Sequence, residues 1–134
     1  MQRVEQRAAG DLSITFESFG FKHGLPADAD FVFDARTLPN PFWDPQLRAL
    51  TGRDAEVIRY LENQPAVGKL LDDIANFVAA RIPEHSASNR RYLTIAVGCT
   101  GGQHRSVYLV DRLVARFVGQ YPNVLARHGS LAPR

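Results

Sequence analysis

The chain has 134 residues and a formal net charge of +2, and 45% of its residues are hydrophobic. This length fits a single domain, and the hydrophobic fraction is high enough for a packed core, which argues against a disordered chain. The small net charge does not by itself indicate a nucleic-acid-binding protein, because such proteins usually carry a clustered basic face.

Membrane and secretory roles are not indicated. No apolar run approaches the roughly 18 residues that a membrane span requires. Residues 1–7 have no apolar stretch after their charges, so they do not have the pattern of a secretory signal. The single cysteine, Cys99, excludes an internal disulfide and fits a reducing compartment. We therefore expect a cytoplasmic protein with no membrane partner.

The first third of the chain predicts two strands separated by loops. Residues 1–10 are polar, and we expect them to be flexible. Apolar and polar residues alternate over Leu12–Glu17, which predicts a half-buried strand, and Phe31–Ala35 predicts a second one. The two glycines and one proline of Ser18–Pro26 predict a loop. Three prolines make 37–45 irregular, with Phe42 and Trp43 expected as packing residues.

The rest of the chain predicts three helices and two further strands. Helical spacing of apolar residues indicates the helices, and short extended runs indicate the strands. The helices are expected over Asp54–Asn63, Ala66–Ile82 and His104–Gly119, and the strands over Arg91–Val97 and Pro122–Arg127. Pro83 is expected to end the second helix, and 84–90 to form a loop.

This order of elements predicts an α/β fold. We expect a single-domain sandwich in which helices flank a small mixed, mostly parallel sheet. The domain is expected over residues 11–128, followed by a tail over 129–134. In such sheets ligands bind at the carboxyl ends of the strands, so the segment that follows the apolar strand Arg91–Val97 is the first candidate for a site.

That segment, Cys99–Ser106, reads Cys-Thr-Gly-Gly-Gln-His-Arg-Ser and predicts an anion site. Glycines allow a close approach of the backbone, the amides of a helix start carry partial positive charge, and an arginine binds phosphate through two parallel hydrogen bonds. Lys22 is expected to add a second charge from the loop after the first strand. The candidate binding residues are Thr100, Gly101, Gly102, Gln103, His104, Arg105 and Ser106, with Lys22 and Ser18.

Two other functions compete with this interpretation. Cys99 and Arg105 have the spacing of the phosphate loop of cysteine-dependent phosphatases, in which a thiolate attacks phosphorus. Gly98 stands where those enzymes have a histidine, so we favour Cys99 as a packing residue at a strand end and assign no catalytic residue. A basic surface for RNA, without a metabolite, is the second alternative. Its candidate contacts are Arg90, Arg91 and Arg127, which are otherwise solvated.

Five segments, in this order along the chain, point to one family; they are Ser18–Gly24, Ala29–Arg36, Leu38–Pro45, Tyr92–Tyr108 and Asn123–His128. Together they resemble the C-terminal domain of the RapZ family of RNase adapter proteins and the related YvcJ-like proteins. The resemblance covers about residues 11–128.

The resemblance implies a domain similar to a subdomain of phosphofructokinase. It further implies binding of glucosamine-6-phosphate, binding of small RNAs, presentation of RNA to RNase E, and assembly into oligomers. The residues that it places at the sugar phosphate are Thr100, Gly101, His104 and Arg105. Phe42 stands where the family has a histidine that reaches the ligand. The family's nucleotide site lies in a separate P-loop domain, and this chain has no Gly-x-x-x-x-Gly-Lys-Ser/Thr motif, so we expect no ATP or GTP site in it.

Overall fold

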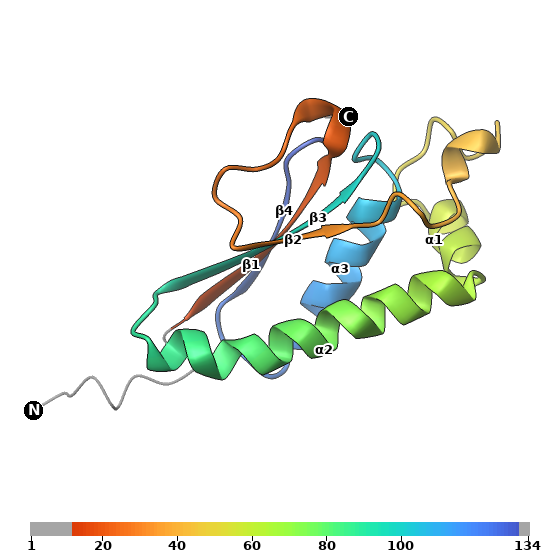
Figure 1. The fold of residues 1–134 in the computed structure, drawn as a ribbon. Coiled ribbons are helices and arrows are strands. Elements are labelled where there is room, and N and C mark those ends of the chain that lie inside the picture. The colour runs from red at the N-terminus through yellow and green to blue at the C-terminus, as the bar shows by residue number, and fades with distance from the viewer. Residues whose placement is uncertain (1–11, 132–134) are drawn as a thin grey trace, which may run out of the picture.

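Four parallel strands form the centre of the computed structural model, which describes residues 12–131 (Figure 1). Their order across the sheet is β2-β3-β1-β4, and every neighbouring pair is parallel. The α/β fold is confirmed, but the sheet is entirely parallel rather than mixed. The strands are β1 (Ser13–Gly20), β2 (Phe31–Asp34), β3 (Tyr92–Cys99) and β4 (Val124–His128).

The helices are α1 (Ala55–Glu62), α2 (Pro65–Ala87) and α3 (Arg105–Phe117), and they cover one face of the sheet (Figure 1). Two connections, β2 to β3 through α1 and α2, and β3 to β4 through α3, cross the sheet in the same direction. Because such crossovers are right-handed, both place their helices on the same face. The connection from β1 to β2 runs the other way, so the same rule directs its residues 21–30 toward the opposite face.

Two of the expected element boundaries are wrong. β1 continues to Gly20, beyond the expected end at Glu17, and a short η3 turn (Phe21–His23) follows it. α2 passes through Pro83 and ends only at Ala87. A proline inside a helix removes one amide donor, but Pro83 is exposed, so water can satisfy the carbonyl that loses its partner. The expected irregular segment contains a second short turn, η4 (Pro41–Trp43).

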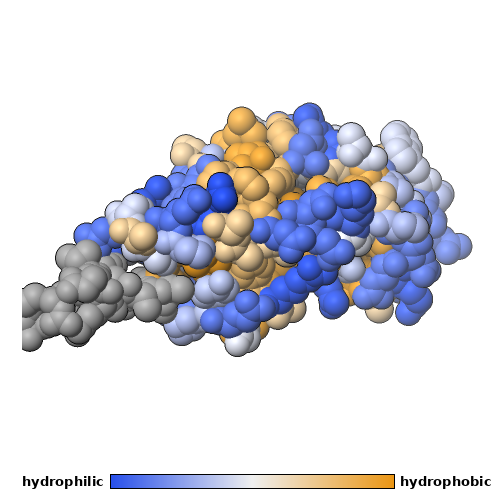
Figure 2. All heavy atoms as spheres, turned by 60° about the horizontal axis from the view of Figure 1, so that its bottom comes forward, coloured by the Kyte–Doolittle hydropathy of each residue, from blue (hydrophilic) through white to orange (hydrophobic). Residues whose placement is uncertain are grey.

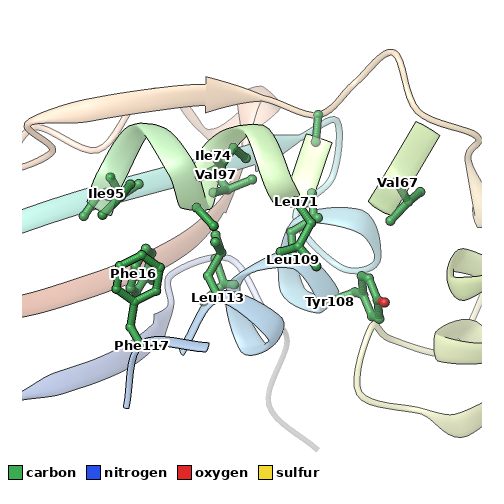
Figure 3. Close-up of a cluster of buried hydrophobic side chains, with 14 of the residues drawn as sticks. Phe16, Val67, Leu71, Ile74, Ile95, Val97, Tyr108, Leu109, Leu113 and Phe117 are labelled. Carbon is green, nitrogen blue, oxygen red and sulfur yellow. The ribbon is translucent and has the colours of Figure 1, made fainter. Parts of the chain in front are cut away.

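The core lies between the sheet and the helices, as Figure 3 shows, and it is built from alternate strand residues and one face of each helix. Ile14 and Phe16 of β1 are fully buried. The ring of Phe16 lies 5.2 Å from that of Phe117, at the end of α3. The outward face of α2 carries charged side chains such as Lys69 and Asp73, which form an ion pair. Figure 2 shows this side of the molecule as a mixture of hydrophilic and hydrophobic residues.

Within residues 12–131, none of the helices combines the length and apolar character needed to span a bilayer. The expected flexible segment 1–10 lies outside the described residues, as do the last residues of the expected tail. Gly129 and Ser130, which begin that tail, are described. The amide of Gly129 donates to the carbonyl of Ser18, and the hydroxyl of Ser130 accepts from the amide of Gly20. These two residues therefore belong to the packed domain.

The burial of Phe16 leads to a test of the core. Phe16→Ala removes a fully buried ring that packs on Phe117, and we expect it to lower the free energy of unfolding by about 3–5 kcal/mol. Leu125→Ala is the matched control, because Leu125 is 62% exposed on β4, and it should change stability by less than about 0.5 kcal/mol. Urea denaturation measures both values. Similar losses in the two variants would contradict this placement of the core.

Candidate functional site

A cavity of about 380 Å³ lies at the carboxyl edge of the sheet. Parallel strands end at the same edge, so the residues after β1, β2 and β3 meet there although they are far apart in the chain. The walls come from the loop between β3 and α3, from η3, and from η4 with the residues that follow it. The expected site residues found in its lining are Lys22, Thr100, Gly101, Gln103, His104 and Arg105.

Arg105 is the first residue of α3, and only 3% of it is exposed. Its Nη1 donates to the carbonyl oxygens of Arg36 and Leu38, at 2.8 and 2.9 Å. Its Nη2 lies 3.5 Å from the hydroxyl oxygen of Thr100, and its Nε has no hydrogen-bond partner. Nη1 thus holds the segment after β2, whereas Nη2 and Nε can still donate hydrogen bonds to a ligand.

The Arg105 guanidinium has no carboxylate in contact with it within residues 12–131, where no aspartate or glutamate forms an ion pair with it. Asp34, at the end of β2, is already engaged by Arg36. The hydrogen bond from Arg36 is the main reason why the pKa of Asp34 is lowered, and the charge of Arg105 adds to the lowering. Burying a cation without a counter-ion is costly, so an anion in the cavity would stabilise this arrangement.

His104 lies beside Arg105 and is 6% exposed. Its Nε2 lies 3.1 Å from the carbonyl oxygen of Leu47. Burial lowers the pKa of His104, and the charge of Arg105 adds to the lowering, whereas the nearby backbone carbonyls oppose it. The ring is therefore neutral at pH 7, with Nε2–H donating to Leu47. His104 holds the segment after η4 against the glycine loop while its ring lines the cavity.

The glycine loop fits tightly between β1 and the end of the chain. Gly102 has φ +76°, and a β-carbon there would lie 2.6 Å from the amide nitrogen of Gly20 and 2.7 Å from the β-carbon of Ser130. The side-chain amide of Gln103 donates to the carbonyl of Ser130. At Gly101, in contrast, a β-carbon would have no atom within 4 Å of it. Gly101 therefore faces open space in the lining, whereas Gly102 packs behind it.

Three expected site residues do not line the cavity. Gly102 packs behind it, as described above. Ser18 is fully buried, and its hydroxyl oxygen lies 2.6 Å from Nδ1 of His128, whose Nε2 lies 2.9 Å from a carboxylate oxygen of Asp111. Ser106 is also fully buried, with its hydroxyl 3.2 Å from Sγ of Cys99. Cys99 itself, at the end of β3, is only 2% exposed but is part of the cavity lining.

The sequence analysis missed part of the lining. The additional residues are Asn40, Phe42, Trp43, Arg48 and Cys99. Phe42 and Trp43 were expected as packing residues of the proline-rich segment. They form an edge-to-face pair at 5.5 Å, but they are 44% and 73% exposed. Arg48 donates from Nε to the carbonyl of Phe42, and its guanidinium lies 4.9 Å from the Phe42 ring. Two adjacent aromatic residues within a proline-rich segment were the feature of the sequence that could have predicted this wall.

No group of three or more histidine, cysteine, aspartate or glutamate side chains within residues 12–131 is arranged to hold a metal ion. The ligand groups that the cavity does offer are cations, amides and hydroxyls. These are donors suited to an anion.

A family model described as the RapZ C-terminal domain matches residues 12–132. The chain belongs to this family. Similar proteins include three named nucleotide-binding protein. That of Chromohalobacter salexigens is 54% identical over 130 residues, that of Nitrosomonas europaea 53% over 129, and that of Ralstonia nicotianae 57% over 122. These alignments cover 97%, 96% and 91% of this chain but 44%, 44% and 41% of the relatives, so the chain spans less than half of their length.

The arginines considered for RNA lie elsewhere in this RapZ-family domain. Arg90 forms an ion pair with Asp30, and Arg127 pairs with both Glu17 and Asp28. Burial raises the pKa of Glu17 although Arg127 opposes the effect, and the neighbouring Glu17 and Arg127 lower the pKa of Asp28. These two ion pairs hold the Arg127 guanidinium at the face of the sheet that the helices do not cover. Arg91 is exposed, and none of the three lines the cavity.

The contrast between the two neighbouring glycines leads to a test of the loop. Gly102→Ala forces a side chain into a left-handed conformation and against β1, so we expect the free energy of unfolding to fall by about 2 kcal/mol or more. Gly101→Ala adds its methyl group to open space and should change stability by less than about 0.5 kcal/mol. Urea denaturation of both variants gives the comparison. Equal losses would show that the loop does not pack as described.

Proposed function

We propose that this RapZ-family domain is a non-enzymatic sensor that binds a phosphorylated sugar, such as glucosamine-6-phosphate, in the cavity at the carboxyl edge of the sheet. The observation that carries the proposal is Arg105, a buried cation of the lining with no carboxylate partner among the described residues. Family membership supports the same class of ligand.

In this proposal the phosphate lies between Arg105 and the glycine loop. The guanidinium supplies charge and directed donors, and the hydroxyl of Thr100 lies beside it. The start of α3 adds the partial positive charge of its amides. The open space at Gly101 leaves room for the sugar phosphate. The exposed rings of Phe42 and Trp43 offer apolar faces for the carbon skeleton of the sugar.

Binding rather than catalysis is favoured by the lack, among the described residues, of an acidic side chain in the cavity. Cys99 is in the lining, with 2% of it exposed, and its sulfur accepts from the amide of Ser106. Cleavage of a phosphoester would require, besides this thiol, a group that protonates the leaving oxygen, and the lining formed by residues 12–131 contains no aspartate or glutamate. The relatives are named nucleotide-binding proteins, but the P-loop motif is absent from this sequence, so a phosphosugar is the ligand that we assign.

Titration calorimetry with glucosamine-6-phosphate tests the site. We expect binding to the unmodified protein and at least a tenfold loss of affinity in Arg105→Gln, because the charged donor to the phosphate is removed. Gly101→Ala should also weaken binding by filling the lining without disturbing the fold. Arg112→Gln is the control, since Arg112 is exposed on α3 and does not line the cavity. Equal affinity in all four proteins would refute the assigned site, and release of phosphate during the titration would favour the phosphatase alternative.

The sensor would act by changing the affinity for a macromolecular partner, in an oligomer in the cytoplasm. Family membership makes a small RNA and RNase E the candidates for that partner. If ligand and RNA are coupled, the coupling is reciprocal, so each must change the affinity for the other by the same factor.

Gel-shift binding of a structured small RNA at several salt concentrations, with and without glucosamine-6-phosphate, tests this coupling. We expect RNA affinity to fall steeply with salt, because phosphate contacts release counter-ions, and to change several-fold when the metabolite is added. Arg91→Gln should reduce the affinity, since Arg91 is exposed and in no ion pair among the described residues. An RNA affinity that the metabolite leaves unchanged would contradict the coupling.

A further inference from the structure

The cations of the cavity share an unusual electrostatic setting. Three basic side chains, Lys22, Arg48 and Arg105, lie in its lining, which contains no aspartate or glutamate. Among residues 12–131 none of the three forms an ion pair. Elsewhere in that part of the chain most basic side chains have an acidic partner; these are Arg36, Arg53, Lys69, Arg81, Arg90, Arg116 and Arg127.

The three cations are not equivalent, because they lie at different depths. Arg105 is 97% buried, given its 3% exposure, whereas Lys22 and Arg48 are exposed. Lys22 comes from η3 and Arg48 from the segment after η4, so the rim charges approach from walls other than the one that carries Arg105. Arg48 is held in place by its hydrogen bond to the Phe42 carbonyl and by the Phe42 ring. The cavity therefore has a positive floor and a positive rim, with the aromatic side chains of η4 in the same lining.

A single phosphate does not balance this arrangement. A phosphate monoester carries about −1.5 to −2 charges at pH 7, whereas Lys22, Arg48 and Arg105 together carry three positive charges, so one phosphate leaves about one positive charge of the lining without a counter-charge. A ligand ammonium group would find no carboxylate in the lining.

We propose that the cavity selects a sugar with two anionic groups, a phosphate at Arg105 and a second phosphate or carboxylate at Arg48 and Lys22. The inference rests on the proposed function, since it deepens the class of ligand assigned to the same cavity. Arg48 is then a specificity-determining residue: it contacts the second anionic group and contributes little to the affinity for a monophosphate.

Titration calorimetry with glucose-6-phosphate, glucosamine-6-phosphate and glucose-1,6-bisphosphate tests this selectivity. We expect the bisphosphate to bind at least tenfold more tightly than either monophosphate at low salt, and the preference to shrink as salt screens the exposed rim charges. In Arg48→Gln the preference should fall to less than threefold, because the bisphosphate loses more affinity than the monophosphates do. Arg112→Gln, which changes an exposed arginine outside the cavity, should retain the full preference.

The outcomes separate this inference from the proposed function. Three outcomes would overturn the proposal of a two-anion ligand but leave the proposed phosphosugar site unaffected. They are equal affinity for the bisphosphate and the monophosphates, tighter binding of glucosamine-6-phosphate than of the bisphosphate, and a bisphosphate preference that persists in Arg48→Gln. Absence of binding by all three sugars would overturn both. Thermal unfolding of Arg48→Gln without ligand shows whether the variant is folded, and Lys22→Gln provides a second rim variant from a different wall, in which the bisphosphate preference should also decrease.

Discussion

The guanidinium of Arg105 joins the parts of the carboxyl edge that would otherwise be independent. It begins α3, and it donates to two carbonyl oxygens in the segment that follows β2. Those carbonyls fix one end of the group, so that its charge remains at the cavity without an acidic partner among the described residues. A buried cation of this kind is stable only where hydrogen bonds, and in the proposed complex an anion, compensate for lost hydration. Arg105 thus connects the start of α3 with the segment after β2 at the cavity.

The parallel sheet is the second constraint, because it determines which segments surround Arg105. With the order β2-β3-β1-β4, the ends of β1 and β3 are neighbours, and Gly20 pairs with Cys99. The glycine loop therefore passes directly over the end of β1, and Gly102 has no room for a side chain. His104 and Gln103 then connect the loop to Leu47 on one side and to Ser130 on the other. The cavity is thus built by long-range hydrogen bonds between short irregular segments, with the sheet as their support.

The η4 segment contributes the part of the cavity wall on which the proposed ligand selectivity depends. Phe42 and Trp43 are exposed in a segment rich in proline, and Arg48 lies against the Phe42 ring. Prolines restrict this segment to few conformations, so the aromatic rings and the arginine are presented to the cavity with little further loss of entropy. A positively charged rim next to apolar ring faces suits a sugar with anionic substituents.

Features that depend on residues close together in the sequence could be predicted, whereas features that depend on residues far apart in the sequence could not. The class of fold, the positions of the helices and strands, and the glycine loop at Cys99–Ser106 were determined by local sequence, because hydrophobic periodicity and glycine and proline positions act over a few residues. The tertiary structure alone decided that Ser18 turns to His128, 110 positions away, that Arg127 pairs with Glu17, and that Arg48 reaches the cavity. Those contacts depend on strand order and register, which set what lies opposite each side chain and leave no periodic signal in the sequence.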